Sequence, residues 1–332
     1  MTDLVTADAG PAATEQYRKE LTAYCYRMLG SSADAEDAVQ DTMVRAWRSF
    51  DRFEGRSSLR SWLYKIATNV CLTMLESRRR RARPMDFGTA GSADAPVPEP
   101  RTDIPWLEPI PDGQVLPTVA DPAELAVSKE SVRLAFVAAL QHLPARQRAV
   151  LILREVLQWK AAEVAELLGT TVASVNSALQ RARATLSEND LDTAPAGDLD
   201  ADQQDLLARY ADAFERYDVS ALVTLLHEDA ILNMPPFDLW LVGPEEIAKW
   251  WVGPGAGCAG SKIVPLTANG GMPGFAQWRR NPDGTGYHAW AVQVLEIRGD
   301  RISGYTSFLD VETLFPMWGL PLRLDPEGLP VD

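Results

Sequence analysis

Residues 161–186 read AAEVAELLGTTVASVNSALQRARATL. Apolar residues recur at helical spacing on both sides of Gly169, which is placed to end a first helix. Thr170 or Thr171 is placed to cap a second helix. The core face of that helix is expected to comprise Val172, Val175, Leu179 and Ala182. Two helices joined by a short turn with a glycine predict a helix-turn-helix, whose second helix enters the major groove of DNA.

The other face of this second helix is polar. It carries Asn176, Ser177, Gln180, Arg181 and Arg183. Asn and Gln can pair bidentately with adenine, and Arg with guanine or phosphate. A plain helical hairpin with a solvated polar face is the alternative, because any surface helix exposes such residues.

The front of the chain predicts two further helices. Residues 33–50 and 58–83 both repeat apolar side chains at helical spacing, and Ser32 is placed to cap the first. The second carries Trp62 and ends in an arginine cluster within residues 78–83. Aromatic and basic side chains together favour a surface that stacks bases and contacts phosphates. The alternatives are a tryptophan in the core and a solvated helix end that complements the helix dipole.

Proline divides the chain. Nine of the 23 prolines lie within residues 84–122, and proline removes backbone donors and blocks helices. A second break falls at residues 191–201. We therefore expect a helical block over 12–83, a Pro-rich linker over 84–120, a second helical block over 121–190, a third folded block over 201–321 and a tail over 322–332.

The third block predicts an α+β domain. Helices are expected over 202–218 and 219–229, and β-rich segments over 230–235, 265–271, 275–280 and 287–310. Turn signals stand at Asp283–Gly284 and Gly299–Asp300. Helices followed by a run of strands predict an α+β fold with a curved antiparallel sheet.

Charge and composition narrow the class of protein. The 332 residues carry a net charge of −14, but residues 1–85 carry +3 and residues 193–332 carry −11. A front that binds nucleic acid is compatible with this segregation. Three scattered cysteines, Cys25, Cys71 and Cys258, and three histidines predict no disulfide framework, metal site or cofactor. With no secretory signal and no membrane-spanning run expected, the composition fits a reducing cytoplasm.

Two long stretches resemble a known family. DAEDAVQDTMVRAWRSFDRFEGRSSLRSWLYKIATNVCLTMLESRRRR (34–81) resembles region 2 of the extracytoplasmic-function (ECF) class of σ70-family sigma factors, and LPARQRAVLILREVLQWKAAEVAELLGTTVASVNSALQRARATL (143–186) resembles their region 4. MPPFDLWLVGPEEIAKWW (234–251) and YHAWAVQVLEIRGDRISGYTSFLD (287–310) resemble SnoaL-like domains of the NTF2-like fold. With WLEPIPD (106–112) in the linker, the chain resembles the actinobacterial ECF subgroup that has a fused SnoaL-like tail.

The resemblance implies two all-α sigma domains and roles for individual residues. The helix over 33–48 would contact the β′ clamp helices of core RNA polymerase, and region 4 the β flap. The clamp contacts would be Asp37, Gln40, Asp41 and Trp47. The −10 contacts would be Arg56, Ser57, Ser58, Arg60, Trp62, Lys65, Asn69, Arg78 and Arg79, with Trp62 and Asn69 at the pocket for a flipped base. The −35 contacts would be Asn176, Ser177, Gln180, Arg181 and Arg183. The family often has Lys or Arg at the positions of Asn176 and Ala178, so fewer phosphate contacts are expected here.

The third block is expected to enclose a cavity that takes a small apolar ligand. Candidate lining residues are Trp240, Trp250, Trp251, Trp278, Trp290, Met234 and Phe237, with an ordinary aromatic core as the alternative. SnoaL-like relatives include cyclases and isomerases that use an Asp or His as acid–base. Candidates for polar groups at such a pocket are Asn233, His288 and Asp310 beside Trp250, but no pair of titratable groups forces catalysis.

The sequence thus predicts a non-enzymatic initiation factor that binds core RNA polymerase, recognises −35 and −10 promoter DNA and promotes melting, with a C-terminal domain that tunes this activity. A helix-turn-helix regulator with a ligand-binding tail is one alternative. An enzyme of the cyclase or isomerase kind with a nucleic-acid-binding appendage is the other. No membrane partner is predicted, and the sequence does not reveal whether a separate anti-sigma factor exists.

Overall fold

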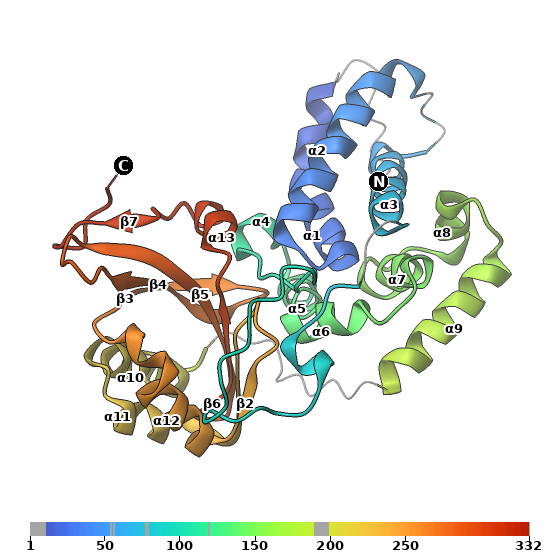
Figure 1. Cartoon of the computed structure of the whole chain (residues 1–332). Coiled ribbons are helices and arrows are strands. Elements are labelled where there is room, and N and C mark those ends of the chain that lie inside the picture. Colours follow the sequence, from blue (N-terminus) through green and yellow to red (C-terminus); the bar gives the residue numbers. More distant parts are fainter. Residues whose placement is uncertain are drawn as a thin grey trace. The chain divides into compact units, whose positions relative to one another are not determined.

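The computed structural model describes residues 11–53, 55, 57–76, 80–118, 120–188 and 199–331. The chain forms two compact units. Residues 1–81 and 113–193 form the helical unit, and residues 82–112 and 194–332 form the sheet-containing unit (Figure 1). In the described part of the chain, no helix combines the length and the apolar character that crossing a bilayer requires.

The first part of the helical unit is a three-helix bundle. Its helices are α1 (Arg18–Leu29), α2 (Ser32–Ser49) and α3 (Leu59–Glu76), with short 3-10 turns over Pro11–Tyr17 and Phe50–Arg52. The core is mainly apolar and also holds the fully buried rings of Tyr24, Tyr26 and Tyr64. The Tyr24 hydroxyl lies 2.8 Å from Thr68 Oγ1. The cap of α2 is Ser31, whose hydroxyl accepts from the Asp34 amide, and not Ser32 as the sequence predicted.

The second part of the helical unit ends in the helix-turn-helix. Its helices are α4 (Asp112–Val115), α5 (Pro122–Glu130), α6 (Leu134–Leu140), α7 (Ala145–Leu151), a π-helical turn over Ile152–Val156, α8 (Ala161–Leu168) and α9 (Val172–Glu188). Gly169 ends α8 at φ 61°, and the Thr171 hydroxyl accepts from the Ser174 amide at the start of α9. The predicted helix pair is therefore confirmed. Val172, however, is 43% exposed, because it lies in the first turn beyond the core.

Two buried arginines tie the parts of the helical unit together. The Arg148 guanidinium donates to Gln141 Oε1 at 2.7 Å and to the backbone carbonyls of Met28 and Leu143. Arg27 Nη2 donates to Ser131 Oγ at 2.6 Å. Burial lowers the pKa of each guanidinium to about 10, so both stay charged and fully dependent on these acceptors at neutral pH.

The sheet-containing unit is a mixed sheet with helices packed on it. The strands are β1 (Leu226–Asn233), β2 (Trp240–Val242), β3 (Lys262–Ala268), β4 (Met272–Arg280), β5 (Tyr287–Arg298), β6 (Arg301–Phe308) and β7 (Arg323–Leu324). Their order is β2-β1-β6-β5-β4-β3, with β7 on β5. Most pairs are antiparallel as predicted, but β1 and β6 run parallel. Helix α11 (Val219–Thr224) is shorter than predicted, because the chain enters β1 at Leu226.

Helices on the sheet enclose the core of this unit. Helices α10 (Ala201–Arg216), α11 and α12 (Pro244–Val252) pack against the strands and form one apolar cluster with them (Figure 1). A 3-10 turn over Pro254–Cys258 follows α12, and α13 (Val311–Met317) packs against β5. The Trp278 ring meets Phe315 of α13 edge-on at 5.0 Å.

The linker segment, residues 82–112, belongs to the sheet-containing unit. It was expected to be extended in part, and apart from a 3-10 turn over Pro84–Phe87 it contains no regular helix before Asp112. The Ala93 side chain is part of the core cluster, and the Ala93 amide donates to Glu246 Oε2 at 2.8 Å. Pro111 of this segment also forms an isolated antiparallel β-bridge with Ala268 of β3.

Candidate functional site

Helix α2 exposes one continuous face. Asp37, Gln40 and Trp47 are exposed on it, and Trp47 is 64% accessible. Asp41 is half-buried and pairs with Arg45 at 2.8 Å, one turn along the helix. Val44, between them, is 38% exposed. A large aromatic ring beside carboxylates and an exposed valine suits a protein interface better than a solvated surface.

The start of α3 holds an aromatic cluster next to a polar helix face. The rings of Trp62 and Phe53 lie 5.1 Å apart, and those of Trp62 and Phe50 meet edge-on at 6.2 Å. Trp62 remains half-exposed despite this packing. Lys65 and Asn69, one and two turns further on, are exposed. The structure therefore brings Trp62, Lys65 and Asn69 to one face of α3, where a π surface, a cation and an amide are available to a nucleotide.

Other residues predicted for the −10 contact are placed differently. Ser58 caps α3, because its hydroxyl accepts from the Ser61 amide at 3.1 Å. Ser57 is exposed beside it. The Arg60 guanidinium is already engaged within the protein, because it pairs with Glu20 at 2.9 Å and lies over the rings of Tyr64 and Trp159. Arg56, Arg78 and Arg79 lie outside the described residues.

Helix α9 presents its predicted polar face to solvent. Asn176, Ser177, Gln180, Arg181 and Arg183 are all exposed. Arg181 Nη1 donates to Ser177 Oγ at 2.6 Å, which holds the guanidinium along the helix. Arg183 pairs with Glu155 at 2.7 Å, so part of its charge is already neutralised. Arg181 is thus the better placed of the two arginines to contact DNA.

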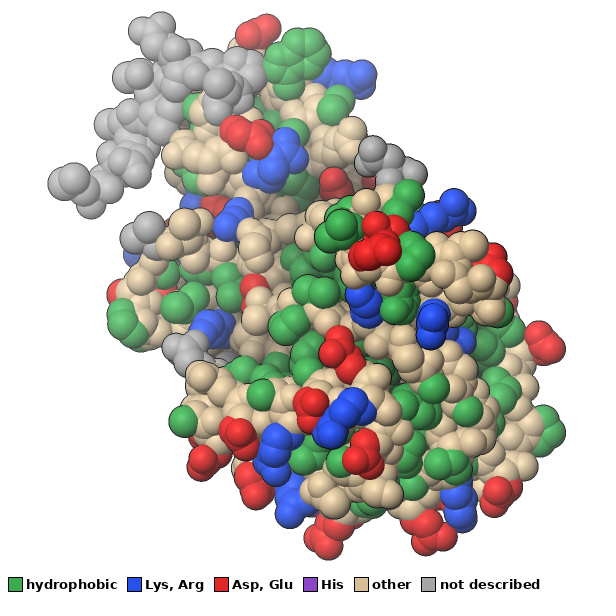
Figure 2. Space-filling model, turned by 90° about the vertical axis from the view of Figure 1, so that its left-hand side faces the viewer, with side chains coloured by type: hydrophobic (Ala, Val, Ile, Leu, Met, Phe, Trp, Pro, Cys, Tyr) green, Lys and Arg blue, Asp and Glu red, His purple; other side chains and the backbone are tan. Residues whose placement is uncertain are grey.

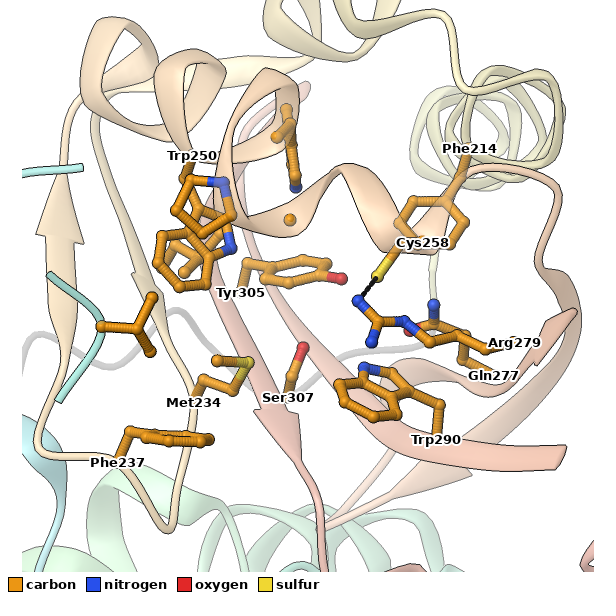
Figure 3. A pocket seen from close by; sticks show the side chains of 15 residues that line it. Phe214, Met234, Phe237, Trp250, Cys258, Gln277, Arg279, Trp290, Tyr305 and Ser307 are labelled. Carbon is orange, nitrogen blue, oxygen red and sulfur yellow. Dashed lines mark hydrogen bonds between the residues drawn. The ribbon is translucent and has the colours of Figure 1, made fainter. Parts of the chain in front are cut away.

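The sheet-containing unit encloses a cavity of about 200 Å³ between α10, α12 and the strands (Figure 3). Of the four predicted pocket residues, Trp250 lines it and the other three do not. Asn233 is buried in β1 and donates to Thr306 Oγ1 at 3.0 Å. His288 Nδ1 lies 2.8 Å from Asn281 Oδ1. Asp310 is exposed at the start of α13.

Most of the predicted aromatic lining is present. Met234, Phe237, Trp251 and Trp290 line the cavity with Trp250, whereas Trp240 and Trp278 lie outside its wall. The sequence reasoning missed the polar part of the wall. That part comprises Gln277, Arg279, Tyr305, Ser307 and Cys258. The alternation of FAQWRR (275–280) was the available signal, because Gln277 and Arg279 follow Phe275 on the face of β4 that turns toward the helices.

Burial decides the charge state of the groups around this cavity. It raises the pKa of Tyr305, so the phenol is neutral and can donate. The pKa of His288 is lowered, first by burial and then by the Arg279 charge. Arg279 is the basic side chain that lines the cavity.

The end of the linker segment is held by a backbone cradle. The Asp112 carboxylate accepts from the amides of Gly270 at 2.7 Å and Gly271 at 2.8 Å. Both glycines have φ 86°, a conformation that strains other residues and lets two successive N–H groups point at one anion. The Ile110 and Asn269 backbones are also hydrogen-bonded, with Asn269 N donating to Ile110 O at 3.0 Å. Asp112 closes the WLEPIPD string, so that string is a docking segment.

Acidic groups of the sheet-containing unit are interspersed with basic ones on its helices. Figure 2 shows carboxylates along the lower edge of one face with Lys and Arg side chains between them. Within α10, Arg209 pairs with Asp205 at 3.0 Å, and Arg216 pairs with Asp212. These pairs fix single side chains on the surface, whereas the net charge of −11 over residues 193–332 sets the field of the domain at a distance.

Three known families match this chain. Residues 14–81 match Sigma-70 region 2, residues 133–186 match Sigma-70, region 4, and residues 207–305 match the SnoaL-like domain. The three matches follow the order of the helical bundle, the helix-turn-helix and the sheet-containing unit.

Individual relatives match over nearly the whole length. The chain is 48% identical over 315 residues to the ECF RNA polymerase sigma factor SigG of Mycobacterium tuberculosis, covering 93% of this chain and 83% of the relative. It is 31% identical over 328 residues to SigJ of the same organism, covering 95% and 96%. The crystal structure of SigJ superposes with a TM-score of 0.56 at 20% identity, covering 94% of this chain and 99% of that one.

Proposed function

This chain belongs to the ECF family of RNA polymerase sigma factors and is an alternative sigma factor with a SnoaL-like C-terminal domain, and on that premise we propose which of its surfaces contact RNA polymerase and which contact promoter DNA. Sigma factors bind core RNA polymerase and promoter DNA. The exposed face of α2, with Asp37, Gln40 and Trp47, is the proposed contact with the β′ clamp helices. The α9 face is the proposed reader of the −35 element, with region 4 also contacting the β flap.

Capture of a −10 base by α3 is the central step of the proposal. The observation that carries it is the half-exposed Trp62 ring, supported by Phe50 and Phe53, on the same helix face as Asn69. A flipped base presents an edge and a π face, and this surface supplies an amide and an aromatic ring. Unstacking a base costs a few kcal/mol, which such contacts offset. Arg60, paired with Glu20, has a structural role in this account.

The SnoaL-like domain is proposed to regulate initiation and not to catalyse a reaction. Asp310, His288 and Asn233 do not line its cavity, so no acid–base group of that set faces a bound molecule. The domain instead holds the linker segment between regions 2 and 4 at Ala93 and Asp112. Whether the linker segment is docked on the domain or released thereby sets how far region 2 and region 4 can separate along a promoter.

The proposal is tested with the full-length protein, core RNA polymerase and a promoter in which the −10 region carries a fluorescent base analogue. Asn69→Ala should reduce the fluorescence change of melting about tenfold, the loss expected for one base-edge contact of ~1–3 kcal/mol. Polymerase affinity should not change, because Asn69 lies on α3 and is not part of the α2 face. Ser61→Ala, at the start of the same helix, is the matched control. Normal melting by a folded Asn69→Ala protein would remove this helix face from strand capture.

A further inference from the structure

The cavity of the SnoaL-like domain is apolar over most of its wall. Figure 3 shows Trp250, Met234 and Phe237 on one side of the space and Phe214 on the other. Leu232 and Trp251 complete the apolar part. The volume of about 200 Å³ far exceeds what one water molecule needs. A wall of this kind binds the ring or chain of a small organic molecule.

One cation points into this apolar space. The guanidinium of Arg279 stacks on Trp290, with its central carbon 3.5 Å from the ring centroid (Figure 3). Its Nη2 donates to Cys258 Sγ at 3.3 Å, and sulfur is a weak acceptor. Its Nε is buried and has no hydrogen-bond acceptor. Within the described ranges, no carboxylate forms an ion pair with Arg279, so its charge is held by ring stacking and lacks a counter-ion.

The other buried polar groups near Arg279 already satisfy one another. Tyr210 Oη donates to Gln293 Oε1 at 2.9 Å, Gln293 Nε2 donates to Gln277 Oε1 at 2.8 Å, and Gln277 Nε2 donates to Ser261 Oγ at 2.9 Å. This chain of amides fixes Gln277 through its Oε1 and one of its two Nε2 hydrogens. The hydroxyls of Tyr305 and Ser307 face the same space as the guanidinium (Figure 3). The polar end of the cavity therefore offers a fixed cation and hydroxyl groups, which together suit an anion.

We propose that this cavity binds a small organic acid with a ring-containing apolar body, whose carboxylate pairs with Arg279 and whose ring lies among Trp250, Phe237 and Met234. The planar guanidinium can donate to both oxygens of a carboxylate. A neutral apolar molecule of the same shape would leave the cation without a partner. The charge of the ligand is thus the feature that the cavity selects.

Binding would also reach the linker segment. Val97 of that segment lines the same cavity, so an occupant contacts the chain that joins regions 2 and 4. The effect on transcription rests on the proposed regulatory function, whereas the binding itself does not. A bound acid adds contacts to the docked linker and should hold it on the domain.

The test measures binding of two probes to the full-length protein by calorimetry. The probes are 2-naphthoate and its uncharged isostere 2-naphthamide. The acid should bind at least ~10-fold more tightly, as expected for a charge-assisted bidentate pair. Arg279→Gln should remove that preference while still binding the amide, which shows that the cavity is intact. Arg280→Gln is the matched control, since Arg280 is the next residue of β4 and is exposed.

A second variant keeps the test decisive if Arg279→Gln does not fold. Met234→Trp fills the apolar half without touching the guanidinium, and should weaken binding of both probes at least ~10-fold. Equal affinities for acid and amide, no binding of the acid, or unchanged binding to either variant would overturn the proposal. If the acid binds as stated but alters neither linker proteolysis nor transcription, the site stands and the proposed effect of the ligand on the linker segment fails.

Discussion

Trp62 packs against two phenylalanines and still keeps part of its ring in solvent. We expect Trp62→Ala to impair promoter melting more than polymerase binding, because the ring serves the captured base and not the α2 face. Trp62→Phe should recover part of the loss, since a smaller ring still stacks. Open complexes resistant to heparin measure the first quantity, and a polymerase pull-down the second. Circular dichroism checks the fold; a folded Trp62→Ala protein that melts promoters normally contradicts the assignment.

Arg181 is hydrogen-bonded to a neutral hydroxyl, whereas Arg183 of the same helix pairs with a carboxylate. If it reads guanine, Arg181→Ala should weaken use of the matching promoter by ~1–3 kcal/mol. If it contacts phosphate, the loss should be similar on all promoters, and the salt slope should fall by about one unit. Arg183→Ala, which removes a guanidinium already paired with Glu155, should have the smaller effect. No effect of Arg181→Ala on either measure would mean that α9 is not the −35 reader.

Single residues show where sequence reasoning stops. The polar face of α9 was predictable, because helical periodicity alone separates it from Val175 and Leu179. Trp250 of the cavity was predictable as a large aromatic of the third block. Arg279 was not, because an arginine next to Arg280 in a strand reads as solvent-exposed until the partner elements of the sheet are known. The ion pair of Arg60 with Glu20 joins residues far apart in sequence and left no local signal.

At the scale of elements, local signals predicted helices better than sheet pairing. Gly169 marked the end of α8 correctly, and of the two threonines predicted as caps, Thr171 is the one that caps α9, because caps act over a few residues. The parallel pairing of β1 with β6 depends on contacts across the domain, and the alternation of side chains does not encode strand direction. The predicted helix over 219–229 was too long for the same reason, because the chain pairs with β6 as a strand from Leu226 onward.

The hold of the SnoaL-like domain on the linker segment can be tested at Glu246. Its carboxylate accepts from the Ala93 amide at 2.8 Å and pairs with Lys249. Glu246→Ala should therefore speed hydrogen exchange and proteolysis within residues 88–100. Glu245→Ala is the matched control, because Glu245 also pairs with Lys249 but is 86% exposed and does not touch the linker. Equal protection of the linker in both variants would mean that Glu246 does not hold it.

The same contact predicts a pH dependence. Hydrogen bonds from Lys249 and from the Ala93 amide lower the pKa of Glu246 to about 2. A carboxyl whose folded pKa is depressed stabilises the docked state fully above its ordinary pKa near 4.5, and this is lost as pH falls toward 2. Linker protection should thus be constant from neutral pH to about 5 and decline below about 4 in the wild type. In Glu246→Ala the decline should be smaller, and an identical decline would assign it to other carboxyls.

For the whole molecule, charge is segregated along the chain: residues 1–85 carry +3 and residues 193–332 carry −11. The ion pairs on the helices of the SnoaL-like domain leave that net charge unchanged. The linker segment offers a mechanical way for the SnoaL-like domain to influence regions 2 and 4. It leaves the region 2 bundle, docks on the SnoaL-like domain from Ala93 to Asp112, and returns to the region 4 helices. In the proposed mechanism, a change in docking alters the chain length available to span −35 and −10.

Transcription in vitro with core RNA polymerase is the most direct measurement of this account. Proteins that end at residues 195, 321 and 332 are compared on the same promoters at two salt concentrations. Loss of the SnoaL-like domain should change promoter output several-fold with little change in polymerase affinity, because it frees the linker and leaves the α2 face intact. The protein ending at 321 tests what the C-terminal residues add. Equal promoter output and equal polymerase affinity for all three proteins at both salt concentrations would contradict the claim that this domain regulates initiation.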